Sequence, residues 1–390
     1  MKNLVTLALL FLSTQAIAQY NSRLILSNGY LPSAKDEVKR RGGSVVADLK
    51  NINATVVNLP SHAVNGFKMA FSHLTIEEDK VIKIGPLKRG NNPGGGDTPQ
   101  PSQNVDWGIV ALKADHAHQA SFTGYNVKVC VADTGIDPTH PDLAANYVGG
   151  VNFTTKGRTV DPSRIEDGHG HGTHVAGIIA AVNNSIGSVG AAYNASIFVV
   201  KVLSDRGSGY LSWIADGVME CVHQGADVIN MSLGGNGNPF SDSVMKTAIM
   251  TAANAGIKVV LAAGNEGDDI ANKTPAGYSQ FHDNIISVAA MGKNNDGSYY
   301  MASWSNYGLN QGASKTDVTA PGVSIYSTWK DGGYNTISGT SMASPYAAAV
   351  VALELASGGS FNLFYQNELQ GYTDSKIGHG LLDAYTTTQF

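Results

Sequence analysis

The chain has 390 residues, of which 43% are hydrophobic and 15% charged, and its formal net charge is −5. This composition supplies a large buried core, and no basic patch favours nucleic-acid binding. Beyond the first residues, no stretch reaches the roughly 18 consecutive apolar residues of a transmembrane helix, so we expect a soluble protein without membrane contact.

The first 18 residues have the three parts of a secretory signal peptide. Lys2 gives a positive start, residues 4–12 are apolar, and Ala16-Ile17-Ala18 has the small-x-small pattern of a cleavage site. The apolar run is too short to act as a membrane anchor. We therefore expect export, to the periplasm or out of the cell, and a mature chain without residues 1–18.

Residues 19–84 are expected to form a small α+β domain. Alternating stretches such as SRLILSNG and NATVVNLP lie around PSAKDEVKRRGG, a pattern typical of strand, helix, strand, helix, strand. Residues 85–102 are rich in Gly, Pro and Asn without periodicity, which predicts an exposed flexible linker.

Residues 103–390 are expected to form one α/β domain, because short apolar runs alternate with helical spacing. This alternation predicts a parallel sheet covered by helices on both faces. The expected strands lie at residues 127–133, 196–203, 226–233, 257–265 and 284–290. The expected helices lie near residues 172–182, 210–223, 241–255 and 342–353.

The two cysteines, Cys130 and Cys221, lie in apolar surroundings. An oxidising compartment would allow a disulfide between them. Two inert, buried thiols fit the sequence equally well.

Three of the expected strands carry polar side chains at their carboxyl ends: Asp133, Ser232 and Asn265. In an open parallel sheet, functional residues gather at the carboxyl ends of strands. Ser341 precedes the apolar helix 342–353, where the field of the helix N-terminus favours developing negative charge.

The segment DGHGHGTHVAG, residues 167–177, contains three closely spaced histidines. They are His169, His171 and His174. Read alone, they fit either a metal site or one catalytic histidine with two neighbours. A serine nucleophile needs a general base and an orienting carboxylate, which Ser341, His171 and Asp133 supply. A metallohydrolase would need further ligands from elsewhere and would leave Ser341 and Asn265 unexplained.

Five motifs occur in a fixed order along the chain. They are VADTGID (131–137), HGTHVAGII (171–179), NMSLGG (230–235), AAGNEG (262–267) and GTSMASP (339–345). Together they resemble the subtilisin family of serine endopeptidases over about residues 103–390. The resemblance implies a three-layer α/β fold, with a mainly parallel central sheet flanked by helices. Tyr346 and Ala349 depart from the family's usual His and Gly.

The resemblance assigns catalytic roles to four residues. Ser341 would be the nucleophile of an acyl-enzyme mechanism, and His171 the general base and then the general acid. Asp133 would orient the imidazole. The Asn265 side chain and the Ser341 backbone N–H would form the oxyanion hole. A catalytically silent binding protein on the same scaffold is the alternative, but the intact set of four argues against it.

Substrate-binding residues are implied by the same resemblance. They are Ser232, Leu233, Gly234, Leu211, Ile214 and Ala276. The first three resemble the strand that pairs with an extended substrate. Leu211, Ile214 and Leu233 match an apolar upstream subsite, and Ala276 the base of the primary pocket. With no charged group evident there, we expect an open pocket and broad specificity with an apolar preference. Each apolar residue would also suit an ordinary core.

The polar loop at residues 180–190 can offer the oxygen ligands that Ca²⁺ prefers. The resemblance adds an Asp and a Gln from elsewhere in the chain. The expected ligands are Gln103, Asp142, the Asn184 side chain and the carbonyls of Val182, Ile186 and Ser188. An ordinary polar loop is the alternative.

Residues 19–84 resemble, in size and pattern, the inhibitory propeptide of this family. A bound template can assist a parallel sheet that folds slowly because its contacts are non-local. The resemblance thus implies an autoprocessed zymogen, with the propeptide as an intramolecular inhibitor. We expect a monomer that acts on protein or peptide substrates. A retained accessory domain is the alternative.

Overall fold

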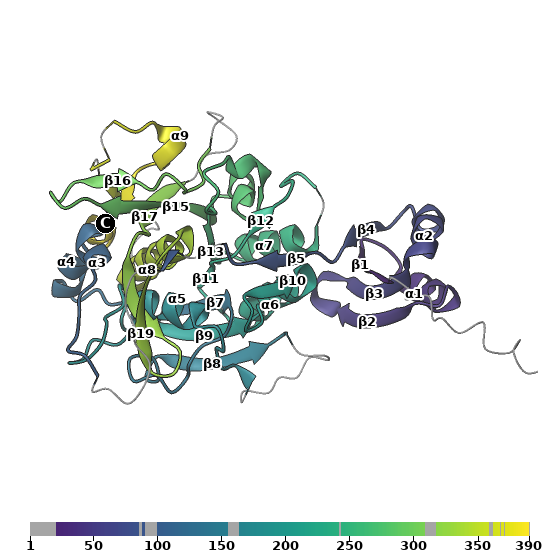
Figure 1. Cartoon of the computed structure of the whole chain (residues 1–390), viewed down its shortest axis with the longest axis horizontal. Coiled ribbons are helices and arrows are strands. Elements are labelled where there is room, and N and C mark those ends of the chain that lie inside the picture. Colours follow the sequence, from purple (N-terminus) through teal and green to yellow (C-terminus); the bar gives the residue numbers. More distant parts are fainter. Residues whose placement is uncertain are drawn as a thin grey trace, which may run out of the picture. The chain divides into compact units, whose positions relative to one another are not determined.

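The computed structural model describes residues 21–85, 88–89, 100–154, 164–241, 243–308, 317–358, 362–366, 368–369 and 371–389 (Figure 1). The chain divides into two compact units, Met1–Asp79 and Lys80–Phe390. The expected signal peptide and most of the expected linker lie outside the described residues. Among the described residues, no helix has the length and apolar character needed to cross a membrane.

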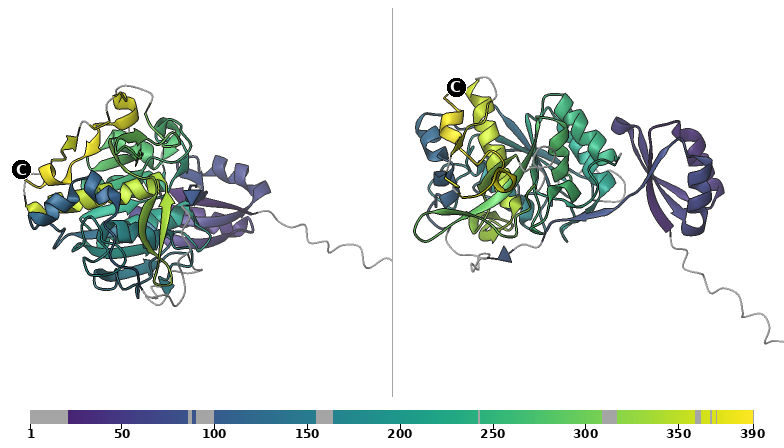
Figure 2. Two further views of the ribbon diagram at one scale, coloured as in Figure 1. Left: turned by 60° about the vertical axis from the view of Figure 1, so that its left-hand side comes forward. Right: turned by 90° about the horizontal axis from the view of Figure 1, so that it is seen from above.

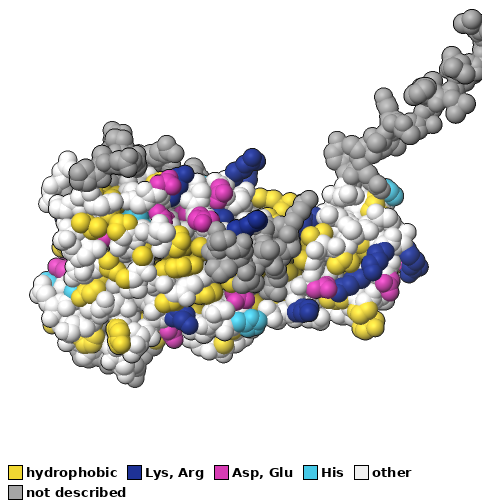
Figure 3. Space-filling view, turned by 90° about the horizontal axis from the view of Figure 1, so that it is seen from below, with side chains coloured by type: hydrophobic (Ala, Val, Ile, Leu, Met, Phe, Trp, Pro, Cys, Tyr) yellow, Lys and Arg dark blue, Asp and Glu magenta, His cyan; other side chains and the backbone are white. Residues whose placement is uncertain are grey.

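The smaller unit contains an antiparallel sheet with the strand order β2-β3-β1-β4, one strand more than the sequence pattern predicts. Its elements are β1 (Asn21–Ser27), α1 (Leu31–Arg40), β2 (Ser44–Leu49), β3 (Ala54–Pro60), α2 (Val64–Ala70) and β4 (Thr75–Glu78). Leu26, Leu59 and Phe67 are fully buried in a core of its own. On its surface, Lys and Arg side chains lie beside Asp and Glu (Figure 3), as in the ion pairs of Arg40 and Arg41 with Glu37.

The larger unit is built on a mainly parallel sheet of ten described strands. Nine follow the order β20-β21-β17-β15-β13-β11-β7-β9-β8, and β16 pairs with β15. Of these ten described strands, only β16 and β20 run antiparallel to their neighbours. The strands are β7 (Lys128–Asp133), β8 (Tyr147–Asn152), β9 (Ser196–Lys201), β11 (Val228–Met231), β13 (Lys258–Ala262), β15 (Ile285–Lys293), β16 (Tyr299–Met301), β17 (Val318–Pro321), β20 (Tyr365–Gln366) and β21 (Leu381–Leu382).

Helices cover both faces of this sheet, which gives the expected three-layer fold (Figure 2). On one face, α5 (His171–Ala180) packs against α8 (Thr340–Ser357); on the other, α6 (Leu211–His223) packs against α7 (Val244–Asn254). Because both faces are covered, β7 is buried along almost its whole length and reads as an apolar run. Shorter helices are α3 (Trp107–Ala111), α4 (Ala114–Gln119), α9 (Asp374–Ile377) and α10 (Ala384–Thr387).

Three small antiparallel sheets border the main sheet. They are β10 (Ser208–Tyr210) with β5 (Val81–Lys83), β12 (Gly235–Asn236) with β14 (Lys273–Thr274), and β18 (Ile325–Trp329) with β19 (Gly333–Ser338) and β6 (Lys88–Arg89). Strand β19 leads directly into α8, so it sets where that helix begins.

The strands and helices expected in this unit are all present, with ends that differ by up to about four residues. The expected runs did not include β8, β17 or the β18–β19 hairpin. Strand β8 contains Gly149 and Gly150 and is half-exposed over most of its length, so it lacks the apolar run of the central strands.

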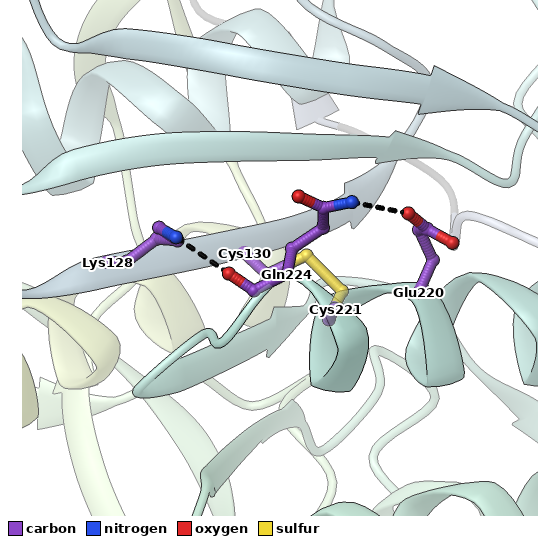
Figure 4. Close-up of a disulfide and its surroundings, with 5 residues drawn as sticks. All are labelled: Lys128, Cys130, Glu220, Cys221 and Gln224. Carbon is purple, nitrogen blue, oxygen red and sulfur yellow. Dashed lines mark hydrogen bonds between the residues drawn. A yellow bond between two sulfur atoms is a disulfide. The ribbon is translucent and has the colours of Figure 1, made fainter. Parts of the chain in front are cut away.

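A disulfide joins Cys130 of β7 to Cys221 of α6 (Figure 4). Both residues are fully buried, and the structure thus decides between the two alternatives that the sequence left open. Beside the disulfide, Lys128 Nζ donates to the Gln224 carbonyl at 2.6 Å (Figure 4). Because the disulfide spans 91 positions, it removes considerable freedom from the unfolded chain and ties α6 to the central strand.

Candidate active site

Asp133 and His171 form a fully buried pair. Asp133 is the last residue of β7, and His171 is the first residue of α5. His171 Nδ1 lies 2.7 Å from Asp133 Oδ1, and the Thr134 N–H donates to the same oxygen at 2.7 Å. Since both side chains are shielded from water, solvent does not screen this interaction. It fixes the imidazole ring with Nε2 on the side away from Asp133.

A second buried carboxylate, Asp167, organises the start of α5. Its Oδ1 accepts from Thr134 Oγ1 and Gly170 N–H, both at 2.8 Å. Its Oδ2 accepts from the N–H and the hydroxyl of Thr173, at 2.9 and 2.8 Å. Burial alone would raise the pKa of Asp167, but these hydrogen bonds outweigh it and lower the pKa. Asp167 is outside the five motifs, and an Asp shortly before a helix start is the signal that could have found it.

Gly170, which precedes α5, can only be glycine. Its φ is 104°, in the region that side chains disfavour. A Cβ at this position would lie 2.3 Å from the Trp329 ring. The close approach of Trp329 therefore depends on this glycine, directly before His171.

The other two histidines of the 167–177 segment have different environments. His174 is fully buried, and its Nε2 lies 3.2 and 3.1 Å from the carbonyl oxygens of Ile325 and Asn335. Burial, then the charge of His171, lowers the pKa of His174 to about 3, so this ring is neutral and joins α5 to the β18–β19 hairpin. Burial also lowers the pKa of His169. Only His171 is hydrogen bonded to a carboxylate.

Ser341 lies in the first turn of α8 and is held against the end of β11. Its Oγ donates to the Ser232 carbonyl at 3.2 Å. In a regular helix the Ser341 carbonyl would accept from the N–H of residue 345, but Pro345 has none. The Ser232 hydroxyl donates to that carbonyl instead, at 2.9 Å. Among the described residues, His171 Nε2 has no hydrogen-bond partner, an arrangement common before substrate binds.

Asn265 presents its amide nitrogen beside the start of α8. Its Oδ1 accepts from the N–H and the hydroxyl of Thr340, both at 2.9 Å. Its Nδ2 therefore faces the opposite side, toward Gly339 and Gly85. Thr340 precedes Ser341, so the same turn of helix carries the serine and orients the amide. Thr340 lies within the GTSMASP motif, but the motif alone does not reveal this role.

A pocket opens beside Ser341 and Asn265. It is lined by Gly85, Leu233, Gly234, Gly235, Ala262, Ala263, Gly264, Asn265, Glu266, Lys273, Thr274, Ala276, Thr340 and Ser341. Ala276, expected near the base of the primary pocket, lines it together with Leu233, and two charged residues, Glu266 and Lys273, line it as well. The sequence pattern shows no sign of these two charged groups, because Lys273 comes to the pocket only through the pairing of β14 with β12.

Residues 80–85 lie extended along β10 and reach the strand expected to bind substrate at Gly234. Strand β5 pairs with β10, and a bridge links Lys83 to Gly234. The Ile84 N–H donates to the Gly207 carbonyl at 3.0 Å, and the Leu211 N–H donates to the Lys80 carbonyl at 2.8 Å. Ile82 is buried, and Gly85 lines the pocket beside Asn265. Ile214 is fully buried within α6. Residues 80–85 therefore form an extended segment beside β10, and Gly85 lies next to the Asn265 amide.

The residues expected to bind calcium lie together around Asp142, which is fully buried. Its carboxylate accepts from Asn184 Nδ2 (2.8 Å), Ser188 N–H (2.9 Å) and the Tyr334 hydroxyl (2.9 Å). Nearby, Gln103 Nε2 donates to the Val182 carbonyl at 3.3 Å, and Ser102 pairs with Ile186. The loop at residues 180–190 and the segment before α3 thus meet around the Asp142 carboxylate.

The negative charge of Asp142 influences neighbouring groups. Each of the three donors named above is neutral. Burial and then the charge of Asp142 raise the pKa of Tyr326 to about 12. Burial, the hydrogen bond to Asp142 and its charge raise the pKa of Tyr334 further. Among the described residues, the donors to this buried carboxylate are all neutral, and a bound cation would be favourable in such an environment.

Comparison with known proteins agrees with this geometry. Residues 124–373 match the sequence profile of the subtilase family. The chain belongs to the subtilase family. It is 40% identical over 322 residues to Subtilisin E of Bacillus subtilis strain 168, covering 83% of this chain and 75% of the relative. It is 44% identical over 255 residues to a Subtilisin of Bacillus pumilus (65% and 86%), and 40% identical over 294 residues to Subtilisin Savinase of Lederbergia lenta (74% and 100%). This subtilase is thus a serine endopeptidase, a hydrolase of peptide or protein substrates.

Replacing Asp167 by Asn should destabilise this subtilase at neutral pH. Because folding lowers the pKa of Asp167, its carboxylate stabilises the folded state at pH values above the unfolded pKa of about 3.9. This stabilisation is lost as the pH falls through the lower pKa of the folded state. Asn lacks the charge and one acceptor, so we expect a loss of roughly 2–3 kcal/mol at pH 7. The difference should shrink below about pH 4. Denaturant unfolding at several pH values, in a Ser341→Ala background that prevents self-digestion, measures this.

The control for Asp167→Asn is Asp331→Asn, since the Asp331 side chain is 79% exposed. This control should leave the free energy of unfolding nearly unchanged. Equal stability of Asp167→Asn and its parent at pH 7, or a difference that grows toward low pH, would contradict the role assigned to Asp167.

Proposed function

We propose that this subtilase is exported and cleaves peptide bonds through a triad of Asp133, His171 and Ser341, with Asn265 in the oxyanion hole. The Asp133–His171 hydrogen bond of 2.7 Å carries the proposal, because it presents the Nε2 side of the imidazole. Ser341 in the first turn of α8 and the Asn265 amide held by Thr340 support it.

In the proposed mechanism, Ser341 Oγ attacks the substrate carbonyl carbon while His171 Nε2 takes its proton. Asp133 keeps the tautomer in which Nε2 accepts, and it stabilises the imidazolium that forms. Asn265 Nδ2 and the Ser341 backbone N–H donate to the oxyanion. His171 returns the proton to the leaving amine, and the acyl-enzyme is then hydrolysed by a water that the same imidazole activates.

Substrate is proposed to bind as an extended strand beside β10 and the segment Ser232–Gly234. The way in which residues 80–85 lie along these edges supports this mode, since main-chain hydrogen bonds recognise backbone of any sequence. Broad specificity follows. Burial of Ile82 supports an apolar preference at the upstream subsite, to which we assign Leu211, Ile214 and Leu233.

We further infer that the chain is made as an inhibited zymogen. Residues 80–85 hold the place of a substrate strand, so they would exclude other peptides until they are released. Residues 80–84 are the last residues of the segment 19–84, which we assign as the propeptide. Export is supported by the signal-peptide pattern of residues 1–18 and by the Cys130–Cys221 disulfide, a bond that persists in oxidising compartments. We propose that the mature enzyme acts as a monomer.

We propose that the residues around Asp142 hold a structural Ca²⁺. The buried Asp142 carboxylate, held by neutral donors of the loop at residues 180–190, supports a site for this hard cation. The proposed ligands are Gln103, Asp142, Asn184 and the carbonyls of Val182, Ile186 and Ser188. When bound, the ion would neutralise Asp142 and tie the loop after α5 to the segment before α3.

A fluorophosphonate probe should label Ser341, because this reagent reacts only with a serine activated by its own site. Mass spectrometry of the secreted, matured protein locates the adduct, and Ser341→Ala is the matched control. No labelling, with activity lost to a zinc-selective chelator, would indicate a metallohydrolase instead. No labelling and no peptidase activity would indicate a silent scaffold.

Calcium should raise the thermal unfolding midpoint of the Ser341→Ala protein. A ligand at one hundred times its Kd stabilises the folded state by about 2.7 kcal/mol. Asp142→Asn removes the central charge and should abolish this dependence, whereas Asp296→Asn, at an exposed position, should retain it. An unfolding midpoint that is the same in calcium and in chelator would contradict the calcium site.

A further inference from the structure

The floor of the pocket beside Ser341 is a two-stranded ribbon that carries a buried lysine. Strands β12 and β14 pair so that Asn236 lies opposite Lys273. Lys273 lines the pocket and is only 4% exposed. Lys273 thus forms part of a pocket whose other walls are mainly small residues, such as Gly234, Ala262 and Ala276.

The ammonium group of Lys273 is held in place by three acceptors. Nζ lies 2.7 Å from Asn236 Oδ1, 3.1 Å from Asp268 Oδ2 and 3.6 Å from Glu266 Oε2. Glu266 Oε2 is itself fixed by Asn306 Nδ2 at 2.7 Å. Moving this side chain aside would break two ion pairs and a hydrogen bond, so Lys273 acts as a fixed part of the floor.

The charged groups around the pocket floor favour neither acidic nor basic side chains of the substrate. One ammonium and two carboxylates sum to a formal charge of −1, so an incoming carboxylate would be repelled by Glu266 and Asp268. An incoming ammonium or guanidinium would meet the buried ammonium of Lys273. A large apolar side chain would press against the same desolvated charge, which is unfavourable.

The space that remains in the pocket is small. Its volume is about 20 Å³, enough for a group the size of one water molecule. The residue at its mouth, Gly85, has no side chain, and a Cβ built there would lie 2.8 Å from Asn265 Nδ2. Both observations indicate that this pocket takes a very short side chain.

We propose that Lys273 sets the primary specificity of this enzyme by filling the pocket floor, so that bonds after small neutral residues (Gly, Ala or Ser) are cleaved in preference to bonds after large or charged ones. This inference rests on the proposed function, since the pocket is the primary one only if Ser341 is the nucleophile. It narrows the broad specificity expected from the sequence at this one subsite and leaves the upstream apolar preference unchanged.

The test compares kcat/KM for peptide nitroanilides that differ only in the residue before the scissile bond: Ala, Phe, Glu or Lys. The wild-type enzyme, produced as the full secreted chain, should favour Ala over each of the others by at least about tenfold. Lys273→Gly should open the floor and shift the Phe-to-Ala ratio by about 10–100-fold toward Phe. Lys273→Met keeps the volume and removes the charge, so it should retain the preference for Ala over Phe.

Controls separate a change of pocket from a loss of fold. Lys293→Gly, at the exposed end of β15, should leave all four rates in their wild-type order. Fluorophosphonate labelling of Ser341 measures the intact site in every variant, and Lys273→Ala replaces Lys273→Gly if the latter is not labelled.

Three results would overturn the proposal while the enzyme remains labelled at Ser341. They are a wild-type rate after Phe equal to that after Ala, an unchanged ratio in the opened variant, and a wild-type preference for Glu that Lys273→Met abolishes. The last would make Lys273 an anion receptor. A wild-type chain that cleaves none of the substrates and is not labelled would instead refute the proposed function.

Discussion

The hydrogen bond between Asp133 and His171 is the constraint on which the larger unit depends. Both side chains are shielded from water, and a buried carboxylate is stable only where donors surround it. Thr134 supplies one donor, and Asp167 fixes the Thr134 hydroxyl while it binds the first turn of α5. The end of β7 and the start of α5 must therefore meet at one point, and the disulfide from β7 to α6 holds that strand from its other side.

A local departure from helix geometry positions the serine. Pro345 deprives the Ser341 carbonyl of its helical partner, and Ser232 replaces the missing donor. The start of α8 is thus joined to the end of β11 through a side chain rather than through packing alone. In the same turn Thr340 orients the Asn265 amide, so the ends of β11 and β13 and the start of α8 form one connected unit.

The sequence predicted the parts of the structure that depend on local pattern. The central strands and their flanking helices have strong apolar periodicity, so Asp133, Asn265 and Ser341 could be placed at strand ends and a helix start. Lys273 could not be placed in this way. It comes from a two-residue strand whose partner, Asn236, is 37 positions away, and no local pattern shows which pocket such a strand borders. The disulfide was undecided for a similar reason, because bonding depends on the separation of two α-carbons in the folded chain.

The most direct test of the arrangement is the kcat of Asp133→Asn on a peptide substrate, with unfolding measured to verify the fold. If Asp133 holds the imidazole in the tautomer that accepts the Ser341 proton, kcat should fall by about 10⁴-fold while KM changes little. A kcat within about tenfold of wild type, in a protein of unchanged stability, would show that the Asp133–His171 bond does not control catalysis.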